Sequence, residues 1–170
     1  EIAIAVVWEN GKHGGSAAQL ARPIFDYWLL KREKNPIRPA AHQISGGLMT
    51  AGIKPGDVNE VILGNVLSAN IGQAPARQAA RAAGIPDEVD ATTINKICSS
   101  GIKSVSYAVQ SILLGDSDVV IAGGMESMSN APYYIENHRE GHKTGHQNII
   151  DGMLKDGLWD PYHNFHMGSA

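Results

Sequence analysis

The sequence predicts an α/β protein with a mixed, mostly parallel sheet covered by helices, followed by a long loop excursion. Three observations support this fold class. Residues 61–66 and 118–122 are short apolar segments with the length and composition of buried strands. Residues 101–114, which lie between them, carry apolar side chains at helical spacing. Because strand, helix and strand follow one another with short connections, we expect parallel strands joined by crossovers.

The first fifty residues give a weaker pattern. Residues 1–7 (EIAIAVV) are apolar and end before Glu9-Asn10-Gly11, which predicts a buried strand. Ser16 is a plausible N-cap for a helix through residues 17–24. The stretch 22–50 is interrupted by prolines and a glycine pair, so we expect no long helix there and the poorest packing of the chain; the interruptions are Pro23, Pro36, Pro39 and Gly46-Gly47.

From Ala51 onward the elements are regular. Gly52 followed by Pro55 indicates a helix end, and a strand is expected at 61–66. A helix is predicted over 73–83, and a further strand over 91–94. The clearest helix spans 101–114, and its apolar face comprises Ile102, Val105, Val109, Ile112 and Leu113. Beyond Met125 the periodicity disappears, which is typical of a long functional loop.

Composition excludes several classes of protein. The 170 residues are 43% hydrophobic and 18% charged, enough to bury a core. A net charge of −3 argues against a strongly basic nucleic-acid binder, and no apolar run is long enough to predict a membrane span. A single cysteine permits no internal disulfide and makes a thiolate metal site unexpected. Because the sequence begins with Glu1, we expect any targeting signal to lie outside it, which leaves the compartment open, with the cytoplasm favoured over mitochondria or peroxisomes.

The single cysteine, Cys98, occupies a position suited to chemistry. It follows a predicted strand and precedes the clearest helix, within Asn95-Lys96-Ile97-Cys98-Ser99-Ser100-Gly101. The positive end of a helix and its unpaired backbone N–H groups favour a thiolate and could stabilise an oxyanion. Small neighbours would let a substrate approach the sulfur. The alternative from the residues alone is a buried structural cysteine that packs as a small hydrophobe.

This stretch resembles the nucleophile motif of thiolases, and the resemblance extends over residues 51–170. It is carried by further motifs in the same order: Gly64-Asn65-Val66-Leu67, Gly72-Gln73-Ala74-Pro75-Ala76-Arg77-Gln78, Ala122-Gly123-Gly124-Met125-Glu126-Ser127-Met128-Ser129 and His166-Met167-Gly168. Within the family the chain is most similar to the acetyl-CoA acetyltransferase (acetoacetyl-CoA thiolase) branch, because residues 153–160 precede that last motif.

The resemblance implies an acyltransferase of the thiolase-like fold. Cys98 would carry an acetyl group from acetyl-CoA, and a second acetyl-CoA would condense with it to give acetoacetyl-CoA and CoA, with thiolysis as the reverse. The backbone N–H of Cys98 would belong to an oxyanion hole, and His166 and Met167 would line the substrate pocket. The family further implies a homotetramer, coenzyme A thioesters as substrates and no other cofactor.

Two other features have plain alternatives. His138, His142 and His146 are spaced by four residues, but intervening glycines and the lack of a placed acidic partner argue against a metal site. In thiolases the corresponding region forms a loop that contributes to tetramer assembly and covers the substrate. Gly123-Gly124 after a strand indicates a tight turn or a close backbone approach rather than a nucleotide loop, since no Gly-Lys-Ser/Thr follows.

The chain also departs from the family pattern. Trp8-Glu9-Asn10-Gly11 stands where thiolases usually carry Arg-Thr-Pro and Gly, and residues 22–50 are divergent. The catalytic His, Asn and second Cys of thiolases lie in a later half. We therefore expect a thiolase-like domain at 1–124, the start of a truncated loop region at 125–170, and an absent C-terminal domain, so that the chain is a fragment with little activity alone. The alternatives are a non-catalytic thiolase-like assembly module, a 3-ketoacyl-CoA thiolase of broader chain length, or a ketoacyl synthase, which the motifs at 72–78 and 166–168 disfavour.

Overall fold

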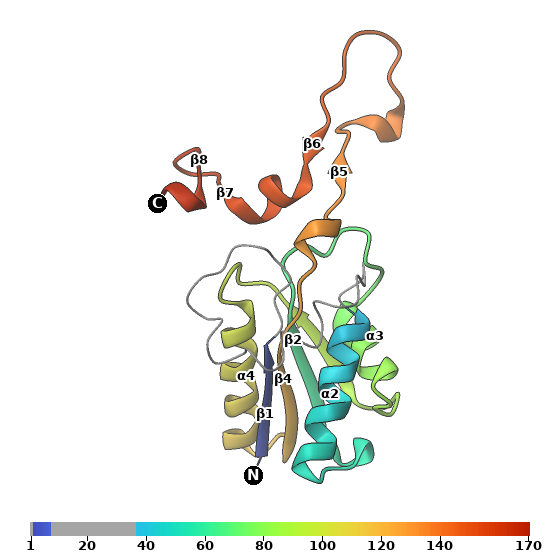
Figure 1. Ribbon diagram of the computed structural model, residues 1–170, viewed down its shortest axis with the longest axis vertical. Helices are drawn as coiled ribbons and strands as arrows, with labels where there is room; N and C mark the ends of the chain where they lie inside the picture. Colours follow the sequence, from blue (N-terminus) through green and yellow to red (C-terminus); the bar gives the residue numbers. More distant parts are fainter. Residues whose placement is uncertain (1, 8–36) are drawn as a thin grey trace.

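The computed structural model describes residues 2–7 and 37–170 of the chain. Within them, one sheet of four parallel strands has the order β1-β4-β2-β3 (Figure 1). These strands are β1 (Ile2–Val7), β2 (Glu60–Gly64), β3 (Asp90–Ile94) and β4 (Val119–Gly124). The predicted strands at 1–7, 61–66, 91–94 and 118–122 are thus confirmed, and with them the α/β class. The predicted helix at 17–24 lies outside the described residues.

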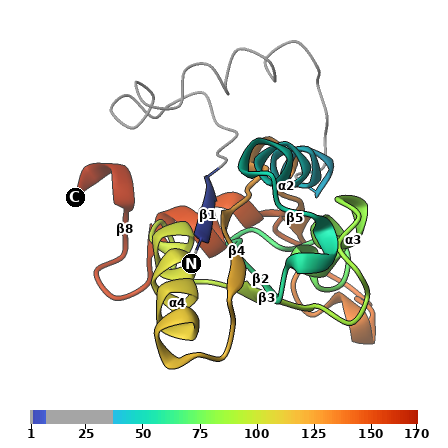
Figure 2. The ribbon, with the colours of Figure 1, turned by 90° about the horizontal axis from the view of Figure 1, so that it is seen from below.

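Helices cover both faces of this sheet. Helices α2 (Ile37–Ala51) and α3 (Pro75–Ala82) pack on one face, and α4 (Ser100–Leu114) packs on the other (Figure 2). Side chains alternate along the strands, so that Val61 and Ile121 face α2 and α3 whereas Ile62 and Val120 face α4. Two separate apolar clusters therefore hold the three layers together.

The helix α2 corrects one expectation from the sequence. Prolines and glycines were expected to prevent a long helix over 22–50, yet residues 37–51 form a helix of 15 residues. Pro39 lies in the first turn, where a backbone N–H has no helical partner to lose. The helix buries Ile37, Ile44 and Leu48 against the sheet, and this burial outweighs the low helix propensity of the glycine pair. It ends where Gly52 was predicted to cap it, with φ of +68°.

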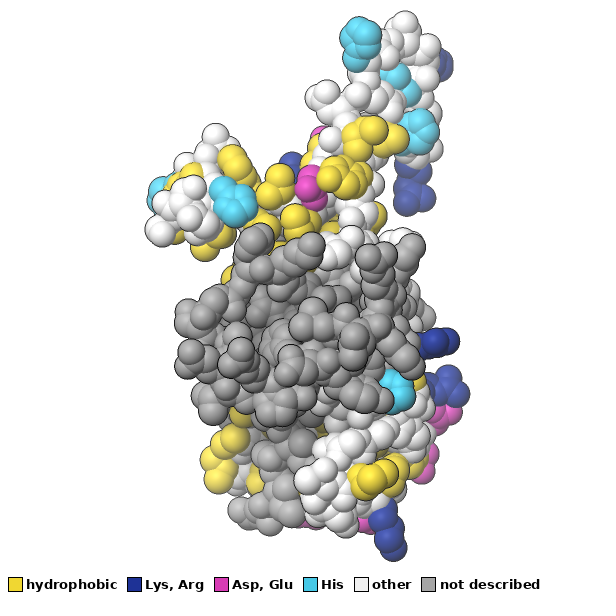
Figure 3. Space-filling model, viewed as in Figure 1, with side chains coloured by type: hydrophobic (Ala, Val, Ile, Leu, Met, Phe, Trp, Pro, Cys, Tyr) yellow, Lys and Arg dark blue, Asp and Glu magenta, His cyan; other side chains and the backbone are white. Residues whose placement is uncertain are grey.

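Helix α4 was predicted as a helix, but the side that it buries is unexpected. Its buried residues are the small ones, Ser100, Ser104 and Ala108, which recur every fourth position. From the predicted apolar face, Val105 and Ile112 pack at the edge of the core. Others point outward: Ile102 and Leu113 are each 77% exposed. Figure 3 shows apolar side chains at the surface on the side where Figure 1 draws α4.

After β4 the chain leaves the three-layered body at the carboxyl ends of the strands (Figure 1). It forms two short antiparallel ribbons, β5 (Tyr133–Tyr134) with β6 (Ile150–Asp151), and β7 (Trp159–Asp160) with β8 (Phe165–His166). A π-helical turn, η4 (Leu154–Leu158), connects them. The expected loop excursion is thus a hairpin and a second ribbon standing over one end of the sheet. Of the helices in the described part of the chain, none is long and apolar enough to cross a membrane.

Candidate active site

A cavity of about 370 Å³ opens at the carboxyl ends of β2 and β4, beside the start of α4. This edge is where parallel α/β sheets bind their ligands. Four segments supply the walls, namely residues 64–67, 97–102, 124–128 and 157–158. The lining is largely apolar, and among its described side chains only Cys98 and Glu126 are ionisable.

Cys98 lies in this cavity and is exposed. Ser99 is the N-cap of α4, so the cysteine directly precedes the helix, as the sequence predicts. The preceding residue, Ile97, has φ of +49°, a left-handed conformation that a β-branched residue rarely adopts. Such a residue persists only where its surroundings hold it.

Two side chains hold the loop that presents Cys98. The Ser100 hydroxyl accepts a hydrogen bond from Lys96 N at 2.8 Å and donates one to Ile97 O at 2.6 Å. Asn95 Oδ1 accepts from Ile97 N at 2.9 Å. Ser100 is only 4% exposed, so its two bonds are partly shielded from water, whereas the bond of Asn95 is exposed. The loop conformation is therefore fixed by its own sequence, and the cysteine is placed by it.

Three glycines let the helix start approach the strand ends closely. A Cβ at Gly64 would lie 2.6 Å from Ser100 C and 2.8 Å from Gly101 N. A Cβ at Gly124 would lie 3.4 Å from Gly101 Cα and from Gly64 O. Backbone therefore contacts backbone where β2, β4 and α4 meet, which brings Cys98 to the edge of the sheet.

Glu126 belongs to the wall formed by residues 124–128, and both of its carboxyl oxygens accept hydrogen bonds. Its Oε1 accepts from Asn65 Nδ2 and Leu67 N, both at 3.0 Å, and its Oε2 accepts from Val66 N at 2.9 Å. Burial raises the pKa of the Glu126 carboxyl above its ordinary value, and this effect exceeds the opposite effect of the hydrogen bonds. Gly123 and Gly124 belong to β4, so the expected tight turn at these glycines is wrong, whereas a close backbone approach is present at Gly124. Glu126, two residues further on, ties the end of β4 to the segment after β2.

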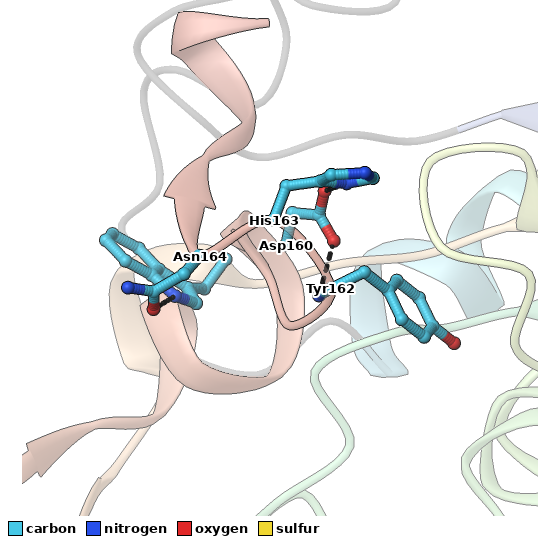
Figure 4. Close-up of polar contacts among 5 residues, drawn as sticks. Asp160, Tyr162, His163 and Asn164 are labelled. Carbon is cyan, nitrogen blue, oxygen red and sulfur yellow. Dashed lines mark hydrogen bonds and ion pairs between the residues drawn. The ribbon is translucent and has the colours of Figure 1, made fainter.

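The structure does not bring His166 and Met167 to this cavity. His166 ends β8, where its Nδ1 accepts from Gly168 N at 2.9 Å, and Met167 is 45% exposed. Neither belongs to the described lining, so their pocket role stays a prediction. Their ribbon is held by local contacts: Asp160 accepts from Tyr162 N and contacts His163 Nδ1 at 2.8 Å (Figure 4). These two hydrogen bonds lower the pKa of the Asp160 carboxyl.

The three spaced histidines lie along the β5–β6 hairpin. Figure 3 shows histidine side chains spread over the part of the surface that projects from the body. Across residues 37–170 and the backbone of β1, no group of three His, Cys, Asp or Glu residues comes together as a metal site would require.

Sequence reasoning found the cysteine but missed the residues that organise its surroundings. Glu126 was read only as part of a turn, and Ser100 only as a small neighbour. A usable signal for Glu126 was an acidic residue directly after a buried strand, at the edge of the sheet where ligands bind. Its partners lie about sixty residues away, and no local pattern indicates them.

The arrangement suits covalent catalysis on an apolar substrate. An exposed thiol at a helix start is a potential nucleophile, and apolar walls would exclude water from a thioester formed on it. The described walls supply no histidine or lysine as a general base.

Comparison with known proteins identifies a family for the chain. Residues 31–170 match the family described as thiolase, N-terminal domain. The chain is 60% identical over 127 residues to acetyl-CoA acetyltransferase 2 of Arabidopsis thaliana. These aligned residues make up 75% of the chain and 32% of the relative. It is 45% identical over 158 residues to acetyl-CoA acetyltransferase of Cupriavidus necator. Here the aligned residues make up 93% of the chain and 37% of the relative. The chain thus spans about a third of the length of these curated relatives.

Proposed function

The chain belongs to the thiolase family through that family's N-terminal domain, and from this membership we propose that the whole protein is an acyl-CoA acyltransferase with Cys98 as its nucleophile. One observation carries the proposal: the single cysteine is exposed in an apolar cavity at the carboxyl ends of β2 and β4. The names of the relatives favour acetyl-CoA over longer acyl thioesters as the substrate.

The proposed reaction divides one condensation into two steps. The Cys98 thiolate attacks the carbonyl carbon of acetyl-CoA, the bond from that carbon to the CoA sulfur breaks, and CoA leaves as a thiolate that takes up a proton. A second acetyl-CoA then loses a proton from its methyl carbon to a base. Its carbanion attacks the acetyl-Cys98 carbonyl, a carbon–carbon bond forms, and acetoacetyl-CoA leaves as the bond to Cys98 breaks.

In this chain the residues of the cavity prepare and shield the nucleophile. Ser100 and Asn95 fix the loop that presents Cys98, and its backbone N–H is the proposed donor to the oxyanion. Because no histidine lies in the described walls, the base is proposed to come from the remaining part of a longer protein, such as the relatives. The exposed apolar side of α4 offers a surface on which a further domain would pack.

A labelling experiment tests the nucleophile. The protein from its complete natural reading frame is incubated with acetyl-CoA labelled in the acetyl group, digested and mapped by mass spectrometry. We expect label on the Cys98 peptide of the wild type and of Ser129→Ala, an exposed residue outside the cavity, and none in Cys98→Ala. A Cys98→Ala protein that still takes up acetyl would refute the assignment.

The lack of a histidine or lysine in the described walls favours one alternative: a non-catalytic, thiolase-like assembly module. The same labelling distinguishes the two, because a module would leave Cys98 unacetylated in every variant.

Further proposals concern partners and organisation. We propose a homotetramer, supported by the β5–β6 hairpin, which projects from the body and exposes Tyr133, Ile135 and Ile149 (Figure 1). Light scattering would measure this state.

We also propose a division at Gly124, where β4 ends, into an N-terminal domain and a loop region, with His166 and Met167 at the substrate pocket. Coenzyme A thioesters are proposed as the substrates, with no other cofactor.

A further inference from the structure

Glu126 connects two parts of the cavity that are distant in sequence. Its carboxylate accepts hydrogen bonds from three consecutive residues after β2: Asn65 through its side chain, and Val66 and Leu67 through their backbone N–H groups. The adjoining backbone adds a fourth link, since Met125 N donates to Gly64 O at 2.9 Å. Gly64 and Asn65 are thus also held by backbone bonds, whereas the backbone N–H groups of Val66 and Leu67 are both held by this one acidic side chain.

The same wall supports the π-helical turn η4. Leu67 is 8% exposed, and a Cβ at Gly157 in the turn would lie 3.2 Å from Leu67 Cδ2. Gly157 and Leu158 line the cavity together with Cys98. A displacement of Leu67 would therefore move the turn that faces the cysteine.

Only a carboxylate satisfies this set of partners. All of the groups that hydrogen-bond to the Glu126 carboxylate are donors, the backbone N–H of Ser127 among them, so both of its oxygens must accept. Asn65 cannot turn around to help, because its Nδ2 also donates to Met125 O at 2.9 Å. A glutamine would keep one accepting oxygen and place its NH₂ group against a donor.

We propose that Glu126 is a positioning residue for the reaction at Cys98: its carboxylate holds residues 65–67, and through Leu67 the η4 turn, at the spacing that an acyl thioester beside Cys98 requires. It contacts no reacting atom. The inference rests on the proposed function, and it concerns binding of the thioester rather than activation of the thiol.

The test compares two reactions of Cys98 in the protein from its complete natural reading frame. Glu126→Gln is expected to raise the KM for acetyl-CoA about 10-fold or more, with a change in kcat below about threefold, because a misplaced wall weakens productive binding. Alkylation of Cys98 by iodoacetamide, which needs no wall, should change less than about threefold. Glu88→Gln, an exposed carboxylate outside the cavity and before the amino end of β3, should leave all three quantities unchanged.

A second variant covers the case in which Glu126→Gln fails to fold. Gly157→Ala pushes the turn against Leu67 from the opposite side and should also raise KM without slowing alkylation. If neither folded variant changes KM, or if alkylation slows as much as turnover, the inference is overturned while acetyl transfer in the wild type stands. A wild type that takes no acetyl label at all removes the proposed function and this inference with it.

Discussion

Substituting Gly64 by alanine tests the contact that places Cys98 at the edge of the sheet. The added methyl carbon would lie 2.6 Å from Ser100 C, 2.7 Å from Ser100 Cβ and 2.8 Å from Gly101 N. Two of these atoms are backbone, so no side-chain rotation relieves the overlap. The start of α4 would have to move away from β2 by roughly 0.8 Å to restore a tolerable contact of 3.4 Å.

The displacement should lower the stability of the fold by an amount that can be measured. Overpacking of a close contact typically lowers the free energy of unfolding by about 1–3 kcal/mol. The loop that contains Ile97, with its left-handed φ, would move with the helix because Ser100 is hydrogen-bonded to it. We therefore expect the free energy of unfolding, measured by urea denaturation of the 170-residue chain, to fall by about that amount. The alkylation rate of Cys98 should also change, because its loop is anchored by Ser100.

A matched glycine in the same chain provides a control, because its substitution should change the free energy of unfolding in the opposite direction. Gly46 is exposed in the middle of α2, and a Cβ there meets nothing within 4 Å. Gly46→Ala should raise the free energy of unfolding by about 0.5–1 kcal/mol through helix propensity alone. Equal stability of Gly64→Ala and wild type would refute the close-contact argument, and so would destabilisation by both substitutions.

Two further predictions concern single hydrogen bonds. Ser104 is fully buried, with its Oγ 2.7 Å from Gly123 O. Ser104→Ala should therefore lower the free energy of unfolding, measured in urea, by about 1–3 kcal/mol. An unchanged unfolding midpoint would show that the bond contributes nothing to stability. The Tyr134 hydroxyl donates to Asp156 Oδ2 at 2.6 Å, which with burial raises the pKa of Tyr134 to about 12. The stability from this bond should be present below pH 10.0 and lost as pH rises through about 12, and Asp156→Ala should return the phenolate titration, followed by ultraviolet absorbance, towards 10.0.

Patterns that repeat locally were sufficient to predict much of the fold. The strands at 60–64 and 119–124 are apolar on both faces because helices cover both, and such runs stand out in a sequence. Gly52 was identified as a helix end because a left-handed residue there favours glycine. In these cases the physical cause lies within a few residues of the effect.

The failures have causes that lie far away in the sequence. Helix α2 was missed because propensity counted Pro39 and the glycine pair, whereas its stability comes from burying Ile44 and Leu48 on the sheet. Glu126 was missed as an organising residue because its partners are about sixty residues away. By contrast, the position of Cys98 was predictable, since a strand, a short loop and a helix are consecutive in the chain.

The unexpected face of α4 and the placement of Cys98 follow from one constraint. For Cys98 to reach the carboxyl ends of β2 and β4, the start of the helix must contact the backbone at Gly64 and Gly124. A helix that approaches so closely can place only small side chains at the centre of the contact, which accounts for Ser104 and Ala108 at full burial, while Val105 and Ile112 pack at its edge. Other large apolar residues are left to the outer side, where Ile102 and Leu113 are each 77% exposed. The amphipathic pattern of this helix therefore identifies its outer side, and the glycines identify the side that serves the cysteine.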